Sequence, residues 1–140
     1  YSAIPVPDLN AAIGAADIIT TTTTATKPLF ADGLVRKGSH VTAIGADCPG
    51  KQELPTKLVA TASLRVCDMA SQSLHHGEFQ SAHRNDASLQ VTELGHILSG
   101  EQIGRTSDED ITVVDLTGIA AQDIAITQTI IDAAAGAKAQ

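Results

Sequence analysis

The feature that most constrains this chain is an alternation of β-branched runs with segments that have the composition of helices. β-branched side chains are stiff at χ1 and favour strands over helices. Strands that alternate with helices indicate βαβ units, because parallel neighbours need a crossover connection. The sequence therefore predicts an α/β fold with an open parallel sheet and a long helix over about 119–135. The predicted strands are residues 17–24, 40–44, 64–68 and 111–116.

Helix signals mark several of the intervening segments. Asp8 is predicted to cap the first helix, because its side chain can accept from the free backbone N–H groups there. Gly77 and Gly100 are predicted to end the third and fourth helices, Gly77 in the left-handed conformation. The threonine tract at 20–24 could instead be a low-complexity linker, but the adjoining Ile18-Ile19 pair favours a strand. The predicted short helices are residues 8–16, 54–60, 69–76 and 91–98.

Composition and charge narrow the classes of function. The 140 residues are 43% hydrophobic, which suits one globular domain with a real core. The formal net charge of −7, with no basic cluster longer than Arg36-Lys37, disfavours a nucleic-acid partner. The sequence shows no signal peptide and no apolar run near the ~20 residues of a membrane helix, so we expect no membrane partner. Cys48 and Cys67 match no metal or disulfide spacing, and a reducing cytoplasm is the expected compartment.

An acidic turn follows the second predicted strand. Residues 45–51, Gly-Ala-Asp-Cys-Pro-Gly-Lys, place Asp47 at the carboxyl end of that strand. Open parallel sheets bind ligands at this edge, so we expect the turn to lie beside the threonine tract and residues 116–118. Hydroxyls, free N–H groups, one carboxylate and one ammonium would suit an anionic, hydroxyl-bearing molecule such as a nucleotide. The alternative is a turn that simply caps a helix.

The sequence lacks the full fingerprint of a dinucleotide site. It contains neither a G-x-G-x-x-G segment between a strand and a helix nor the acidic ribose ligand expected after one. We therefore expect the phosphate cradle to lie upstream of Tyr1. The predicted sheet would then be half of a doubly wound sheet.

Several blocks of the sequence resemble one enzyme family in their order and spacing. They are residues 17–19 with the threonines, D-x-P-G-K-x-E-L at 47–54, Gly77-Glu78, residues 104–108, and D-x-T-G-x-A-x-Q-D at 115–123. Together they resemble the ornithine cyclodeaminase, archaeal-type alanine dehydrogenase and mu-crystallin family over nearly the whole chain. The two long blocks are specific, whereas the threonine run alone is weak.

This resemblance implies a fold, a cofactor and a set of site residues. Residues 1–140 would be the C-terminal portion of an NAD(P)-binding, Rossmann-like doubly wound domain, with an N-terminal substrate and dimerisation domain outside the sequence. The cofactor would be NAD or NADP, the substrate a small amino acid, and the complete protein a homodimer. Asp47 matches the family's catalytic acid/base in the substrate pocket, and Thr117 matches a substrate contact. Cofactor contacts are expected from Thr23, Thr24, Val41, Thr42, Ala43, Ile44, Lys51 and Leu116.

The implied reaction is an NAD(P)-dependent deamination, such as L-ornithine to L-proline plus ammonia. A carboxylate at Asp47 would accept or return protons while hydride moves between the α-carbon and the nicotinamide. The alternatives are an alanine-dehydrogenase-like oxidoreductase and a non-catalytic, mu-crystallin-like binding protein. The mu-crystallin branch lacks an aspartate at this position, so Asp47 favours an enzyme. The isolated 140-residue chain is expected to be inactive, because it would lack the phosphate loop and the substrate domain.

Other polar clusters are interpreted as ordinary surface features. The histidines at 75, 76 and 83 with Glu78 do not have the spacing of a helical ligand pair, so no metal site is predicted. Residues 108–110 lack the alternating spacing of a calcium loop. Cys48 has no histidine placed by the sequence to activate it, which favours a small, semi-buried thiol over a nucleophile.

Overall fold

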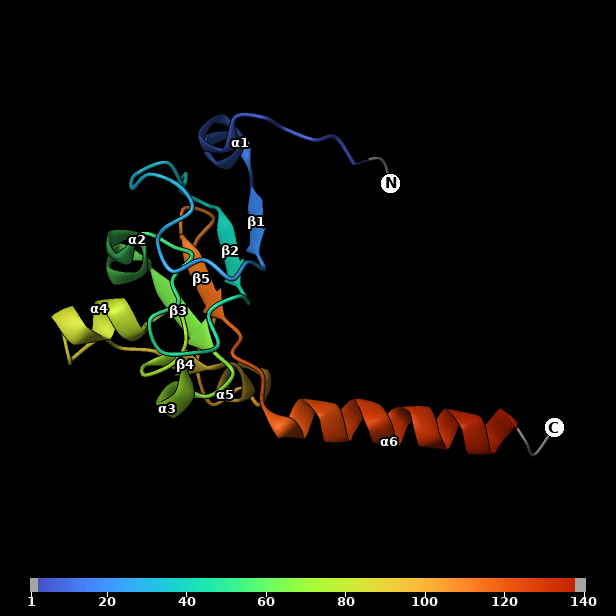
Figure 1. Cartoon of the computed structure of the whole chain (residues 1–140). Helices are drawn as coiled ribbons and strands as arrows, with labels where there is room; N and C mark the ends of the chain where they lie inside the picture. Colours follow the sequence, from blue (N-terminus) through green and yellow to red (C-terminus); the bar gives the residue numbers. More distant parts are fainter. Residues whose placement is uncertain (1–2, 138–140) are drawn as a thin grey trace.

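The computed structural model describes residues 3–137 and centres on a five-stranded sheet. All neighbouring strands are parallel, in the order β1-β2-β5-β3-β4. Helices flank the sheet, and the long C-terminal helix extends away from it (Figure 1). The predicted α/β fold with a parallel sheet is confirmed. The strands are β1 (Ile18–Thr21), β2 (His40–Ala43), β3 (Leu64–Cys67), β4 (Thr92–Glu93) and β5 (Thr112–Asp115).

The helices agree with the predicted segments in part. Asp8 caps the first helix as predicted, because its carboxylate accepts from the Ala11 N–H at 3.0 Å. The helix predicted over 69–76 is a single turn, and a further helix after Gly77 was not predicted. The helices are α1 (Leu9–Ala15), α2 (Thr56–Thr61), α3 (Ala70–Ser73), α4 (Gln80–Asn85), α5 (Leu94–Leu98) and α6 (Ala120–Ala137).

Two predictions about the third and fourth helices were wrong. Gly77 does not adopt a positive φ, and its lack of a side chain has another cause: a Cβ there would overlap the Asp115 carboxylate. The helix predicted over 91–98 begins only at Leu94, because Thr92–Glu93 pair with β3 as the extra strand β4. Gly100 ends this helix at φ +80°, in the left-handed conformation that glycine tolerates best.

The core lies on the face of the sheet that carries α2. Val41 and Ala43 of β2 and Val113 of β5 are fully buried there and belong to one apolar cluster with Leu58 and Val59 of α2. Side chains alternate along a strand, so the residues between them point to the opposite face. This alternation fixes the register of the central strands.

The carboxyl ends of three neighbouring strands meet at one edge of the sheet. The Ile44 N–H donates to the Thr21 carbonyl at 2.9 Å, which joins the ends of β2 and β1. The Leu116 N–H donates to the Ala43 carbonyl at 3.0 Å, which joins the ends of β5 and β2. The loops after β1, β2 and β5 therefore start side by side, as the sequence predicts. We call this edge the rim.

The helix α6 differs from the rest of the fold in its exposure. It begins soon after β5 and projects from the body of the molecule (Figure 1). Four isoleucines along it, at 124, 126, 130 and 131, are 55–69% exposed. Within residues 3–137, no helix combines the length and the apolar character needed to cross a membrane.

Candidate functional site

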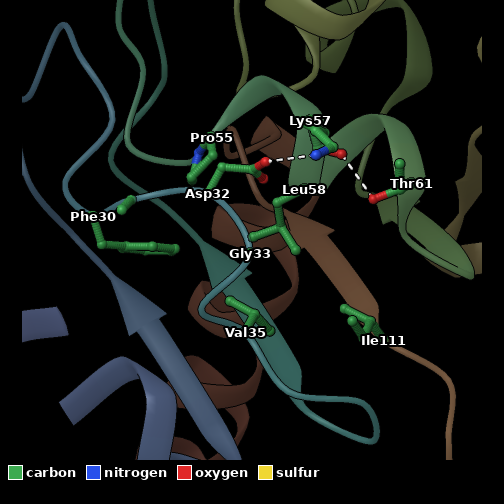
Figure 2. A pocket seen from close by; sticks show the side chains of 10 residues that line it. Phe30, Asp32, Gly33, Val35, Pro55, Lys57, Leu58, Thr61 and Ile111 are labelled. Carbon is green, nitrogen blue, oxygen red and sulfur yellow. Dashed lines mark hydrogen bonds and ion pairs between the residues drawn. The ribbon is translucent and has the colours of Figure 1, made fainter. Parts of the chain in front are cut away.

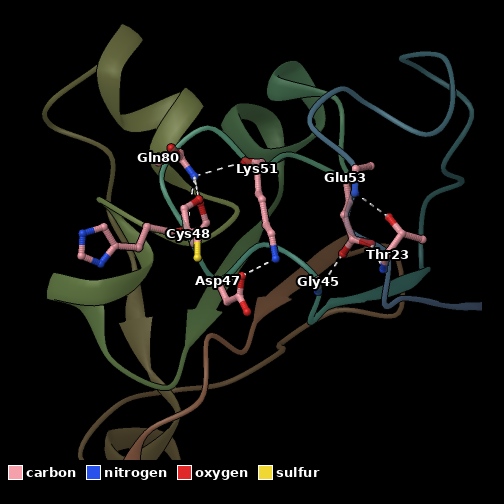
Figure 3. Close-up of polar contacts among 10 residues, drawn as sticks. Thr23, Gly45, Asp47, Cys48, Lys51, Glu53 and Gln80 are labelled. Atoms are coloured by element: carbon pink, nitrogen blue, oxygen red, sulfur yellow. Dashed lines mark hydrogen bonds and ion pairs between the residues drawn. The ribbon is translucent and has the colours of Figure 1, made fainter.

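The Asp47 turn leaves β2 at the centre of the rim. The Lys51 ammonium donates to Asp47 Oδ1 at 2.5 Å (Figure 3), and the two side chains are 24% and 52% exposed, respectively. This hydrogen bond holds the pKa of Asp47 below its usual value and raises that of Lys51. Asp47 is therefore an ionised carboxylate open to solvent. Its neighbour Cys48 is exposed, whereas the sequence predicted a semi-buried thiol.

The buried side chain of Gln80 braces the backbone of the Asp47 turn. The Gly50 N–H donates to Gln80 Oε1 at 2.9 Å, while Gln80 Nε2 donates to the Lys51 carbonyl at 3.1 Å (Figure 3). Gln80 is the first residue of α4 and is only 2% exposed. Gly50 has φ +85°, a conformation that glycine adopts without strain. The sequence predicted the turn but not its brace.

Glu53 links the Asp47 turn to the loop after β1. Its carboxylate accepts from the Thr21 hydroxyl at 2.7 Å, the Thr23 N–H at 2.5 Å and the Gly45 N–H at 2.9 Å. The residue is fully buried. Burial would raise the pKa of Glu53, but these hydrogen bonds outweigh it and leave the pKa below its usual value. An ionised acid therefore lies beneath the rim.

Two further buried acids continue inward from Glu53. Glu78 accepts from the Glu53 and Leu54 N–H groups at 2.9 and 2.7 Å. Asp115, the last residue of β5, accepts from the Glu78 N–H at 2.9 Å and from the Ser73 hydroxyl. Burial raises the pKa of Glu78 to about 8 and that of Asp115 to about 7. Among residues 3–137, Asp115 Oδ1 has no hydrogen-bond partner.

The third loop of the rim is held by Asp68, which follows β3. The Thr117 hydroxyl donates to Asp68 Oδ1 at 3.0 Å, and the Gly118 N–H donates to Asp68 Oδ2 at 2.7 Å. Gly118 has φ +84°, which permits the tight turn into α6. Thr117 thus lies at the rim, as predicted, with its hydroxyl already bonded to a carboxylate.

The residues predicted to contact a cofactor divide by location. Thr23 and Thr24 are exposed in the loop after β1, and Ile44 is 43% exposed. Leu116 is half-buried where β5 ends. Val41 and Ala43 are fully buried, so neither exposes a surface that a ligand could touch in this structure. Thr42 lies on the opposite face, with its Oγ1 3.0 Å from His40 Nε2.

The acids that build the rim carry a weak sequence signal. Glu53, Glu78 and Asp115 each adjoin an apolar residue that is itself buried or half-buried. A carboxylate in such a context is expensive to bury unless it is hydrogen-bonded, which marks it for a structural or functional role. The signal indicates burial but does not identify the partners.

The two pockets that lie against the sheet are both away from the Asp47 turn. One, of about 130 Å³, lies between α2 and the loop at 30–35, with the Asp32–Lys57 ion pair of 3.1 Å beside it (Figure 2). The other, of about 280 Å³, is lined by residues of the opposite sheet face, including His40 and Val114. Asp47 lines neither. In the described part of the chain, no three His, Cys, Asp or Glu residues are grouped so as to hold a metal ion.

Comparison with known proteins identifies the family. The model of the ornithine cyclodeaminase/mu-crystallin family matches residues 5–138. The chain belongs to this family. The resemblance predicted from the sequence blocks is confirmed, and the Rossmann-like parallel sheet is similar in fold to solved structures that contain bound NAD.

Several curated relatives of this family member are enzymes by name. The chain is 41% identical over 129 residues to a Delta(1)-pyrroline-2-carboxylate reductase of Bacillus cereus, covering 89% of this chain and 39% of the relative. It is 38% identical over 118 residues to an alanine dehydrogenase of Archaeoglobus fulgidus, covering 81% and 36%. The chain thus spans about two fifths of the length of these relatives.

Two similar solved structures contain NAD. The iminosuccinate reductase of Paracoccus denitrificans in complex with NAD+ matches with a TM-score of 0.84 and 36% identity, over 94% of this chain and 41% of that one. An archaeal alanine dehydrogenase dimer with bound NAD matches with a TM-score of 0.80 and 35% identity, over 87% and 39%.

Proposed function

We propose that the full-length protein is an NAD(P)-dependent enzyme that deaminates a small amino acid, with Asp47 as its acid/base. One observation carries this proposal: an ionised, half-exposed carboxylate lies at the meeting point of three strand ends. Open α/β sheets bind their ligands at such a point. The names of the relatives, an alanine dehydrogenase and two imine reductases, support hydride transfer at a carbon that bears nitrogen.

The rim has the features needed to hold the nicotinamide end of a dinucleotide. Thr23 and Thr24 offer exposed hydroxyls, and Ile44 offers an exposed apolar surface next to the Asp47 turn. When bound, the dinucleotide would supply and accept the hydride. We assign the phosphate loop, much of the substrate pocket and the dimer contacts to the part of the relatives' length that this chain does not span. Residues 1–140 would then be the C-terminal portion of the cofactor domain.

The proposed role of Asp47 follows from its protonation state. After the α-carbon has lost hydride and become part of a C=N bond, Asp47 as a carboxylate would take a proton from the amine or water that adds to that carbon. It would then return that proton to the departing ammonia. The hydrogen bond from Lys51 keeps the pKa of Asp47 low and so holds it ionised. Thr117 would orient the substrate through a hydroxyl that Asp68 already fixes.

The test is Asp47→Asn in the full-length protein. Loss of a positioned acid/base is expected to lower kcat by roughly 10²–10⁴-fold, while the Kd for NAD or NADP stays within severalfold of the wild type. The matched control is Asp32→Asn, because Asp32 also pairs with a lysine but lies away from the rim. Unchanged turnover in Asp47→Asn would remove the catalytic role and leave a non-catalytic binding protein as the better description.

A second candidate is a reductase of cyclic imines. The observation that favours it is the 41% identity to a Delta(1)-pyrroline-2-carboxylate reductase. Ammonia distinguishes the two: a deaminase releases it from L-ornithine or L-alanine, whereas an imine reductase consumes NAD(P)H and releases none. An ammonia assay run beside a nicotinamide absorbance assay therefore decides between them.

A further inference from the structure

We propose that Glu53 is a positioning residue that clamps the loop after β1 to the Asp47 turn. In this role it sets the spacing between the threonines expected to face the cofactor and the carboxylate expected to handle protons. The inference rests on the proposed function for its catalytic meaning. The clamp itself is formed by residues of this chain and requires no bound ligand.

The three donors to Glu53 come from both sides of the rim. Thr21 and Thr23 belong to the end of β1 and the loop after it, and Gly45 begins the Asp47 turn. Figure 3 shows the Glu53 carboxylate between Thr23 and Gly45. The Glu53 side chain thus joins the two loops, in addition to the backbone bond in which the Gln52 N–H donates to the Ala25 carbonyl at 2.9 Å.

The backbone of Glu53 is fixed independently of these loops' side chains. Its N–H donates to the buried Glu78 carboxylate at 2.9 Å, and its carbonyl accepts from the Leu29 N–H at 2.8 Å. Glu78 is in turn held by Asp115 at the end of β5. Glu53 is therefore held on one side at the sheet, through Glu78, and on the other at the connection between β1 and β2, through Leu29.

The arrangement of donors requires a carboxylate and not an amide. Oε1 accepts from the Thr23 N–H, while Oε2 accepts from the Gly45 N–H and the Thr21 hydroxyl. A glutamine would turn its NH2 group toward one of the two backbone N–H groups, whichever way its amide is oriented. One loop would then lose its acceptor and face a donor instead, while the Thr21 hydroxyl could rotate to adapt.

The two loops also touch through their backbones. A Cβ on Gly45 would overlap the Thr23 carbonyl oxygen and the carboxyl carbon of Glu53. The contact leaves no free space between the loops, so a shift of one is transmitted to the other. Release of either loop is therefore expected to alter the spacing across the rim.

The experiment compares Glu53→Gln with the wild type in the full-length protein. Calorimetric titration with NAD and NADP is expected to show a Kd raised at least tenfold, and the KM for the dinucleotide should rise in parallel. Glu109→Gln is the matched control, since it makes the same chemical change just before β5, at the opposite edge of the sheet. If Glu53 only stabilised the fold, Glu53→Gln would lower the melting temperature but leave the Kd unchanged at temperatures well below that melting temperature.

Hydrogen exchange tests the clamp without any dinucleotide. In Glu53→Gln the amide of Thr23 or of Gly45 is expected to exchange at least tenfold faster than in the wild type, with amides of the central strands unchanged. A Kd within twofold of the wild type, or unchanged exchange at both amides, would overturn the proposal. If the wild type binds no dinucleotide, the proposed function fails, and the exchange result still decides the clamp.

A graded variant covers the case in which Glu53→Gln does not fold. Thr21→Val removes one of the three hydrogen bonds and leaves both backbone bonds in place. It is expected to raise the Kd by an intermediate factor of about threefold and to speed exchange at Thr23 and Gly45 to a smaller extent. No change in either quantity would contradict the clamp.

Discussion

The two edges of the sheet hold their acidic residues in opposite ways. At the carboxyl edge, Glu53, Glu78 and Asp115 are buried and accept hydrogen bonds from backbone N–H groups. At the amino edge, Asp17 and Glu109 form ion pairs with Arg36 and Lys37 in which each side chain is about half exposed or more. Exposed pairs contribute little to stability, whereas buried acids that fix loops are costly and are retained for specific ends. The difference supports our proposal that the carboxyl edge is the functional one.

The buried acids of the carboxyl edge should make the free energy of unfolding depend on pH. We expect this effect to be larger than any effect of the ion pairs at the amino edge. The pKa values of Glu78 and Asp115 are about 8 and about 7 in the folded chain, above their ordinary values of 4.5 and 3.8. At a pH between the ordinary pKa of each acid and its pKa in the folded chain, the folded state binds more protons than the unfolded state. The free energy of unfolding therefore falls as pH rises through this range. Denaturant titration of the full-length protein should show a loss on the order of 3 kcal/mol between pH 6 and pH 8.

The control for this prediction is Glu78→Gln, because glutamine does not titrate. The variant should be less stable than the wild type at pH 6, where it loses an acceptor for a backbone N–H, yet its stability should change less with pH. Stability that is flat from pH 6 to pH 8 in the wild type would show that these acids do not take up protons on folding.

The amino edge should give the smaller effect. Arg36→Met removes the ion pair with Asp17, whose side chain is 91% exposed, and also a hydrogen bond to the Ala15 carbonyl. Thermal unfolding is expected to shift by only a few degrees, about 4 °C or less, because the groups stay hydrated. Dinucleotide affinity should be unchanged. A shift as large as that of Glu78→Gln would erase the contrast between the edges.

The sequence predicted the elements whose signals are local. The β-branched runs predicted four of the five strands, and the Gly- and Pro-containing turn predicted where Asp47 lies. The strand β4 was missed because Thr92–Glu93 has no apolar run and exists only through its pairing with β3. Gly77 was misread because its neighbour across the fold, the Asp115 carboxylate, is 38 positions away along the chain.

The buried acids show the same limit of sequence reasoning. Glu53 stands in a block that was quoted for the family resemblance, but its partners Thr21 and Thr23 lie 32 and 30 positions away. The sequence indicates that an acid next to the apolar Leu54 is in an unusual setting for a charged side chain. Only the folded chain shows which N–H groups donate hydrogen bonds to it. The catalytic candidate Asp47 was easier to predict, because it is exposed in a turn whose residues are contiguous.

The most direct test of the account is a crystal structure of the full-length protein with NAD or NADP bound. The nicotinamide ring should lie at the rim, beside Asp47 and between the loops that carry Thr23 and Thr117. A dinucleotide bound instead at the amino edge or on the face lined by His40 and Val114, with Asp47 remote from the ring, would contradict it.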